Sequence, residues 1–328
     1  MPKVLNANLD ALKVLLAVMV VALHCKLLGG NYTWVGYLLC NGLFRVAVPT
    51  FFIINGYYLF QTLESGHSFA QWFKRGLLLY LFWMLVYSPQ YIDPSTIASL
   101  GGVLGVVKKL LIGYFHLWYL VGMLGGAAML LVLRRWRSSA LIGLALTAFL
   151  IGLGLQYARV YYELPNGFLQ HFNQNDYTAR NFLFMGFPFM AIGFLCARHR
   201  LAERLSRRGV CCWLVLGLGL ILAEAALNFA LRADVEQNFD FLASLLVIAP
   251  ALFLLPQVYF RASHSNFAAK LSSAVYYVHP WFIFGALSLG MAYGNGMAGL
   301  VLLLAFGVAP LLIICLLYTS DAADDLLC

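Results

Sequence analysis

Long apolar stretches, separated by shorter polar ones, recur from one end of this chain to the other. Ten of them come close to the roughly 20 residues that a helix needs to cross a bilayer. They cover residues 11–28, 42–60, 75–91, 114–133, 138–156, 180–198, 210–230, 239–258, 271–290 and 297–314. The pattern predicts an all-α, polytopic membrane protein in which about ten transmembrane helices form one bundle.

Composition and charge narrow the class of protein. Hydrophobic residues make up 62% of the chain and charged residues 10%, which excludes an ordinary soluble domain. A net charge of +8 would suggest nucleic acid binding in a soluble protein. When the N-terminus is placed in the cytoplasm and the helices alternate, however, twice as many lysines and arginines fall on the cytoplasmic side as on the other. We therefore expect a lipid bilayer and no nucleic acid as partner, in the plasma membrane with a cytoplasmic N-terminus.

The last residues differ in character from the rest of the chain. From Cys315 onward the sequence turns abruptly from aliphatic to acidic, and it is similar to the conceptual translation of a sequencing adapter. We expect residues 1–314 to form the native transmembrane domain and residues 315–328 to be foreign. A fused C-terminal domain would then have been lost by truncation.

The first apolar stretch carries ionisable side chains in an otherwise aliphatic helix. Lys13 and His24 lie within roughly 20° of each other on one helical face and about 16 Å apart along the axis. An ionisable group inside the membrane costs about 2.5–3.5 kcal/mol and marks a functional site by default. Asp10 lies three residues before Lys13, the spacing of an ion pair. The structural alternatives are a packing histidine and a lysine that extends to the interface.

Further polar residues open the later helices on the outer side of this topology. Arg45 and His116 begin the second and fourth apolar stretches, and Arg180 begins the sixth. His279 precedes Pro280 in the ninth, where the proline leaves a backbone carbonyl for a polar side chain to satisfy. Arginines and aromatic residues at these depths also serve as plain interfacial anchors, so both interpretations stay open.

Five short motifs occur in a characteristic order across nearly all of residues 1–314. They are Asp10-x-x-Lys13 with His24, Arg45 with Asn55-Gly56-Tyr57, His116-Leu117-Trp118-Tyr119, Arg180-Asn181, and Tyr276-Tyr277-Val278-His279-Pro280. In this order they resemble the membrane-bound acyltransferase family 3, and most of all the membrane domains of vancomycin-resistance serine racemases and related stand-alone O-acyltransferases. Lys13 stands where arginine is commoner in that family, and Asn55 where serine is usual.

The resemblance implies a bacterial O-acyltransferase. It would move an acyl group, expected to be acetyl, from cytoplasmic acyl-CoA to a hydroxyl or amine of a surface carbohydrate, a peptidoglycan precursor or an exported small molecule. Acyl-CoA is then a co-substrate, and no cofactor is implied. The seven cysteines show no metal-ligand spacing, so no metal site is expected.

The resemblance also assigns roles to residues. His24 would act as the general base, with Lys13 and Asp10 completing the catalytic group. By their charge, Lys13, Lys74 and Arg75 are candidates to bind the phosphates of acyl-CoA, although a cytoplasmic excess of basic residues explains the last two better. The substrate-binding residues would be Arg45, Asn55, Tyr57, His116, Trp118, Tyr119, Arg180, Tyr277 and His279.

Two other functions remain open. Buried ionisable groups also suit a proton-coupled transporter, such as an exporter or a serine-uptake module, but no inverted repeat or pair of broken helices supports it. The chain is alternatively a receptor-like scaffold for a missing C-terminal domain. Binding or hydrolysis of acyl-CoA would separate the enzyme from both alternatives.

Overall fold

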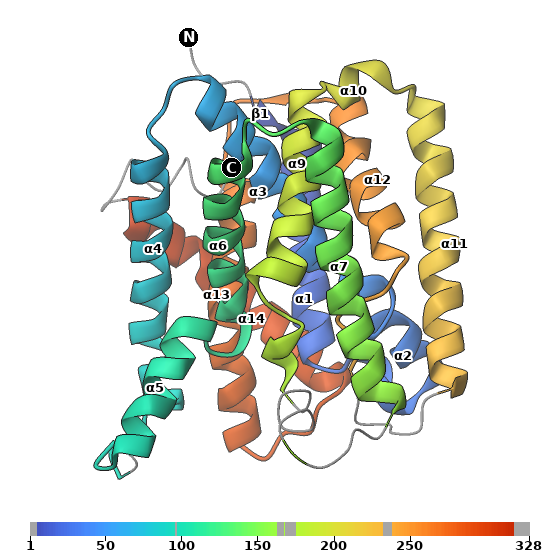
Figure 1. Cartoon of the computed structure of the whole chain (residues 1–328). Coiled ribbons are helices and arrows are strands. Elements are labelled where there is room, and N and C mark those ends of the chain that lie inside the picture. The colour runs from blue at the N-terminus through green and yellow to red at the C-terminus, as the bar shows by residue number, and fades with distance from the viewer. Residues whose placement is uncertain (1–4, 96, 163–166, 168–174, 232–237, 318–328) are drawn as a thin grey trace.

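A computed structural model describes residues 5–95, 97–162, 167, 175–231 and 238–317, with side chains to residue 313 (Figure 1). The described part is a helical bundle with one two-residue antiparallel pair of strands, β1 (Leu5–Asn6) and β2 (Ala262–Ser263). The helices are α1 (Ala7–His24), α2 (Trp34–Cys40), α3 (Ala47–Glu64), α4 (Phe69–Val86), α5 (Leu100–Ile112), α6 (Trp118–Leu133), α7 (Ser138–Tyr161), α9 (Phe187–Arg198), α10 (Leu201–Arg204), α11 (Arg207–Leu231), α12 (Leu245–Val258), α13 (Phe267–Ser288) and α14 (Asn295–Leu317). Most of the stretch expected to be foreign, residues 318–328, lies outside the described residues.

The membrane class of the protein is confirmed, but the number of spans is not. Among the described residues, six segments are long and apolar enough to cross a bilayer: Ala7–His24, Trp34–Glu64, Phe115–Leu133, Ser138–Tyr161, Arg207–Leu231 and Asn295–Ile313. Each of the ten apolar stretches overlaps one described helix. The helices that are not among these six segments are shorter or less apolar. The expected count of about ten spans is therefore not confirmed.

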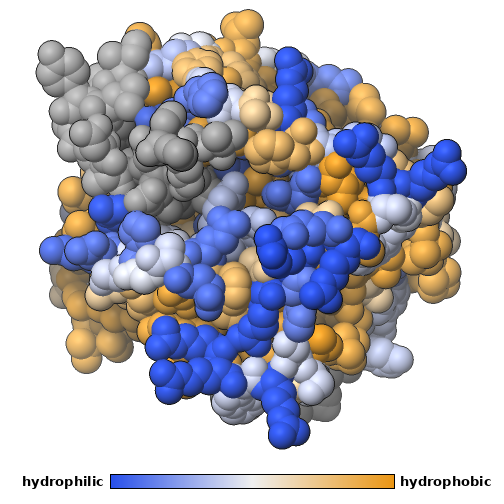
Figure 2. Space-filling view, turned by 90° about the horizontal axis from the view of Figure 1, so that it is seen from above, coloured by the Kyte–Doolittle hydropathy of each residue, from blue (hydrophilic) through white to orange (hydrophobic). Residues whose placement is uncertain are grey.

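The long helices run between two ends of the bundle (Figure 1). We call the end that carries β1, β2 and α10 the α10 face, and the opposite end, which carries α5, the α5 face. Hydrophilic side chains crowd the α10 face, and apolar ones lie mainly around its rim (Figure 2). The exposed arginines of the adjoining turns are Arg134, Arg135, Arg137, Arg200, Arg204, Arg207 and Arg208.

Helix α1 lies inside the bundle, against α3, α12, α13 and α14. Its start is fixed by Asn6, whose side chain accepts hydrogen bonds from the amides of Asn8 and Leu9 at 3.1 and 3.3 Å. The same Asn6 side chain donates to the carbonyl of Pro256 in α12 at 2.8 Å. The cap therefore sets both the beginning of α1 and its height beside α12, which in turn sets the depth of Lys13 and His24.

Helices α3 and α9 approach each other closely through glycine. A Cβ added to Gly56 would lie 2.0 Å from the carbonyl oxygen of Met190, and one added to Gly193 would lie 1.9 Å from that of Ile53. No side chain fits in either place. Small residues at helix contacts are how membrane helices gain close packing without a hydrophobic driving force.

The stretch 239–258 differs from its expected form, because α12 begins only at Leu245 and the residues before it are not helical. Gln156 satisfies this backbone from α7: its side chain accepts from the amides of Asp240 and Phe241 and donates to the carbonyl of Phe241. Glu224 accepts in the same way from the amides of Ala243 and Ser244. Irregular backbone among membrane helices is tolerated where protein groups pair it, as here.

Replacing Gly193 by alanine should destabilise the bundle, because the new methyl group meets backbone that cannot move aside. Overpacking of this kind typically costs about 1–3 kcal/mol. Gly285→Ala in α13 is the matched control, since nothing lies within 4 Å of a Cβ at that position. Thermal unfolding of the purified variants in detergent measures the difference. Equal unfolding temperatures for the two variants would contradict the close contact between α3 and α9.

Candidate functional site

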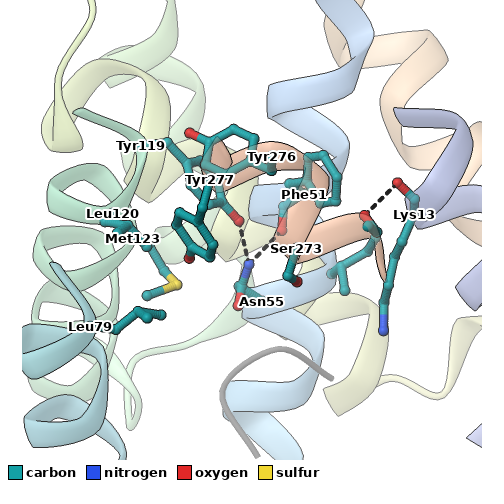
Figure 3. A pocket seen from close by; sticks show the side chains of 12 residues that line it. Lys13, Phe51, Asn55, Leu79, Tyr119, Leu120, Met123, Ser273, Tyr276 and Tyr277 are labelled. Carbon is teal, nitrogen blue, oxygen red and sulfur yellow. Dashed lines mark hydrogen bonds between the residues drawn. The ribbon is translucent and has the colours of Figure 1, made fainter. Parts of the chain in front are cut away.

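A small pocket of about 50 Å³ lies beside Lys13. Figure 3 shows Lys13 at one end of this pocket and Tyr119, Leu120 and Met123 at the other, with Asn55 between them. The Asn55 amide donates to the hydroxyl of Tyr119 and to the carbonyl of Phe51. Helices α1, α3, α6 and α13 thus meet around a polar point in an apolar surround. We call this space the Lys13 pocket.

The ammonium of Lys13 is held by Asp10, as their spacing predicts. Lys13 Nζ lies 3.0 Å from Asp10 Oδ1, and the two residues are only 4% and 5% exposed. Burying a charge is costly unless it is paired, so the pair explains how Lys13 remains inside the bundle. The second carboxylate oxygen, Asp10 Oδ2, has no hydrogen-bond partner among the described residues.

A larger cavity of about 340 Å³ lies toward the α5 face. Its lining includes His24, Arg45 and His116, which the sequence places on the same side of the membrane, together with Trp118 and Arg180. We call it the histidine cavity. Lys13 and His24 both face the protein interior, but they line different spaces. Tyr276 is the one described residue that lines both.

A proline in α13 determines the hydrogen bonds of two histidines. Pro280 has no amide hydrogen, so the carbonyl of Tyr276, four residues earlier, receives no helical hydrogen bond from it. His279 Nδ1 lies 2.7 Å from this carbonyl oxygen, and a carbonyl can only accept, so Nδ1 carries the hydrogen. His279 Nε2 is then the lone-pair nitrogen of the neutral ring.

His24 contacts that lone pair directly. Its Nδ1 lies 2.9 Å from His279 Nε2, and the two rings are stacked with their planes 9° apart. Because His279 Nε2 accepts, His24 Nδ1 must donate. The remaining nitrogen, His24 Nε2, keeps its lone pair, and none of the described residues bonds to it. The pair therefore presents one unprotonated imidazole nitrogen in the histidine cavity.

His116 is buried in the same wall with its ring unsatisfied. It is 3% exposed, and neither ring nitrogen has a hydrogen-bond partner among the described residues. Its place is fixed through the backbone, since the hydroxyl of Tyr276 donates to the His116 carbonyl at 2.7 Å. The preceding residue, Phe115, has φ +49°, a left-handed conformation that is uncommon for a bulky side chain. Such strain is found where function fixes a local geometry.

Two arginines share one carboxylate on the opposite wall. Asp240, in the irregular segment before α12, forms an ion pair with Arg45, and its second oxygen lies 3.5 Å from Arg180 Nη1. Burial alone would raise the pKa of the Asp240 carboxyl, but the guanidinium groups of Arg180, Arg45 and Arg159 outweigh it and hold that pKa below its usual value. Asp240 is therefore a fixed negative charge between two fixed positive ones.

The predicted site residues divide into three groups. The histidine cavity gathers His24, Arg45, His116, Trp118 and Arg180, and His279 supports it from behind. The Lys13 pocket gathers Lys13, Asn55, Tyr119 and Tyr277.

Five predicted residues line neither space within the described part of the chain: Asp10, which pairs with Lys13, His279, which contacts His24, and Tyr57, Lys74 and Arg75. Tyr57 packs against Tyr58 and Phe253, while Lys74 is exposed and Arg75 half-buried on α4.

Sequence reasoning missed both carboxylates of the histidine cavity, Asp176 and Asp240. A signal for Asp240 existed, because it is the only acidic residue in the apolar stretch 239–258 and a lone charge there is costly. Asp176 gave no such signal, because it lies in a polar connection. The sequence identified Tyr276 only as part of a motif. Its position beside both cavities could not be predicted, because it depends on the packing of several helices.

Comparison with known proteins assigns the whole bundle to one family. A family model described as an acyltransferase domain matches residues 6–319. The chain is 29% identical over 296 residues to a serine/alanine racemase of Enterococcus gallinarum, covering 85% of this chain and 41% of the racemase. It is 25% identical over 291 residues to an amino-acid racemase of Enterococcus faecalis, covering 83% and 40%. The chain thus spans about two fifths of the length of these relatives. No solved structure gives a significant match.

Asp240→Asn should destabilise the protein at neutral pH and change its response to acid. Because the pKa of the folded carboxyl is lowered, its contribution to stability is complete above the pKa of the unfolded chain and is lost as pH falls through the folded pKa. Removing one partner of a buried ion pair typically costs about 3–5 kcal/mol. Thermal unfolding from neutral pH to below about pH 4 should show a lower, flatter profile for the variant.

Glu203→Gln is the control for this experiment. Glu203 pairs with Arg200 at the surface, where both side chains are well exposed, and such pairs contribute little. If Asp240→Asn and Glu203→Gln both gave the unfolding profile of the unaltered protein, the Asp240 network would not contribute the stability predicted for it.

Proposed function

Because the chain belongs to the family of acyltransferase domains, we propose that it is a membrane O-acyltransferase with His24 as its general base. The observation that carries this proposal is the free lone pair of His24 Nε2 in a cavity large enough for a small substrate. The donor would be acyl-CoA, most simply acetyl-CoA, and the acceptor a hydroxyl or amine on a surface glycan, a peptidoglycan precursor or an exported small molecule.

The donor would enter from the α10 face. Exposed arginines gather there, and their charge suits the phosphates of CoA. The Lys13 pocket lies along α1 between that face and His24. The Lys13 ammonium, held by Asp10, would bind a phosphate of the donor, whose acyl group would reach His24 about 16 Å further along α1.

The acceptor would react in the histidine cavity. His24 Nε2 takes the proton of the acceptor hydroxyl as its oxygen attacks the thioester carbon. The carbon–sulfur bond then breaks, the ester forms, and the CoA thiolate leaves and regains a proton from the His24 imidazolium. His279 positions this base, because its Nε2 holds the His24 Nδ1 hydrogen throughout. The scheme needs no acyl-enzyme intermediate.

The expected setting is a bacterial plasma membrane with the N-terminus in the cytoplasm. The Enterococcus relatives support a bacterial origin, and the arginines of the α10 face support this orientation. In this setting the Lys13 end of α1 faces the CoA pool and the histidine cavity faces the exterior.

A transport function is the second candidate. It is favoured by two cavities that share Tyr276 as a lining residue, in a chain whose relatives carry racemase names. In that case the membrane domain would move an amino acid for a larger protein. Purified protein would then neither hydrolyse acetyl-CoA nor be stabilised by CoA, which separates this candidate from an acyltransferase.

His24→Ala should lower the rate of acyl transfer by about 10²–10⁴-fold, the usual contribution of a general base. His279→Ala should lower kcat while leaving the KM of either substrate nearly unchanged, because it removes only the group that orients His24. His67→Ala is the control, since His67 is exposed and bonds only to Ser65 in the described structure. Release of CoA thiol is the measurement. Full turnover in the His24 variant would remove the base assignment.

Lys13→Ala should impair use of the donor, and Lys13→Arg should do so much less, because either cation can meet a phosphate of the donor. The dependence of rate on acyl-CoA concentration in inside-out vesicles measures this loss. A raised KM for acyl-CoA at constant kcat indicates that Lys13 binds the donor. Unchanged kinetics in the alanine variant would reduce Lys13 to a structural partner of Asp10.

A further inference from the structure

We propose that the acceptor bound in the histidine cavity is an anion, whose carboxylate or phosphate is held by Arg180. This inference rests on the proposed function, because it describes the acceptor of that reaction. The binding of an anion can nevertheless be tested independently of the reaction. Two arginines on the same wall, Arg45 and Arg180, are bonded within the protein in different ways.

Every nitrogen of the Arg45 guanidinium already donates a hydrogen bond within the protein. Its Nε donates to the carbonyl of Cys40 at 2.8 Å, one terminal nitrogen pairs with Asp240, and the other donates to Asn41 Oδ1 at 3.0 Å. All three nitrogens are therefore engaged within the protein. Arg45 supports the wall of the cavity and holds Asp240 in place.

Arg180 is held without any such hydrogen bonds. Its nearest carboxylate oxygens lie at 3.5 Å on Asp240 and 3.9 Å on Asp176, and Arg180 Nε is buried with no partner among the described residues. The guanidinium lies over the ring of Trp118, 5.2 Å from its centroid, so its plane is supported by stacking. A planar fork of donors that is positioned but unsatisfied fits a carboxylate or phosphate.

His116 provides a second, independent sign that a polar ligand belongs here. Both nitrogens of this buried ring lack partners in the described structure, although a buried polar group without one costs about 1–3 kcal/mol. His116 lies two residues before Trp118, whose ring supports the Arg180 guanidinium. Both residues therefore belong to the same short segment. A bound anion would accept from Arg180 and from the N–H of His116 together.

The charges of the cavity favour an anion over a neutral acceptor. Among the described residues, Arg45, Arg180 and Lys26 line it together with two carboxylates, Asp176 and Asp240. Asp240 is shared by Arg45 and Arg180, and Asp176 also pairs with Arg159. An anionic ligand would balance the remaining positive charge, whereas a neutral sugar would leave Arg180 with only its longer contacts to Asp240 and Asp176.

Three hydroxyl compounds with the same three-carbon skeleton test the proposal: glycerol, glycerate and glycerol 3-phosphate. They differ at one end, which is neutral, a carboxylate or a phosphate. Their effect on the unfolding temperature of the full chain in detergent is compared at matched ionic strength, set with sodium chloride. The variants are Arg180→Gln, Arg180→Lys and, as the control, Arg159→Gln, which removes a charge from the same network at a residue outside the cavity lining.

We expect at least one anion to stabilise the unaltered protein and Arg159→Gln, and glycerol to have no effect. Arg180→Gln should weaken that response about ten-fold or more, and Arg180→Lys should restore part of it. The stronger of the two anions identifies the acceptor group as carboxylate or phosphate. The proposal is overturned if glycerol stabilises as well as the anions do, if neither anion stabilises, or if Arg180→Gln responds like the unaltered protein.

Hydrolysis of acetyl-CoA by the same preparations separates this proposal from the proposed function. Anion binding that depends on Arg180 without any hydrolysis would leave the site standing and remove the acyltransferase. Hydrolysis without anion binding would remove only the anionic acceptor.

Discussion

The absence of one amide hydrogen, at Pro280, determines the chemistry that this site can perform. It frees the carbonyl of Tyr276 inside α13, and His279 fills the vacancy with its Nδ1 hydrogen. His279 can then only accept through Nε2, so His24 must donate through Nδ1 and keeps a lone pair on Nε2. A backbone defect in one helix thereby sets the protonation pattern of a side chain on another. The Asn6 cap gives His24 the depth at which the two rings meet.

A second irregularity builds the opposite wall. The segment before α12 stays non-helical because Gln156 and Glu224 satisfy its backbone from α7 and α11. Asp240 consequently faces Arg45 and Arg180 instead of taking a place in a regular helix. Both walls thus rely on paired backbone groups outside regular helical bonding, which a membrane interior allows only where protein side chains replace water. Regular helices bring these walls together, and the irregular segments carry most of the polar groups.

Sequence reasoning recovered the features that depend on local pattern. The apolar stretches overlap the helices, the i, i+3 spacing of Asp10 and Lys13 gives a real ion pair, and the polar residues at helix starts line one cavity. It could not separate Arg45 from Arg180, because the difference lies in partners from distant segments. Nor could it show that Lys13 and His24 line two spaces that share Tyr276, since the position of that ring depends on how α13 packs against α3 and α6. The irregular start of α12 was hidden by a continuous apolar pattern.

The tautomers of His24 and His279 test this account most directly. They can be read from the ¹⁵N chemical shifts of the ring nitrogens in histidine-labelled protein at neutral pH, assigned with His24→Gln and His279→Gln. The account predicts hydrogen on Nδ1 of both rings and an unprotonated Nε2 on His24. It also predicts that Pro280→Ala, which restores a competing amide hydrogen at the Tyr276 carbonyl, weakens the preference of His279 for Nδ1. A hydrogen on Nε2 of His24 in the unaltered protein would contradict the account, because that nitrogen could then not act as the base.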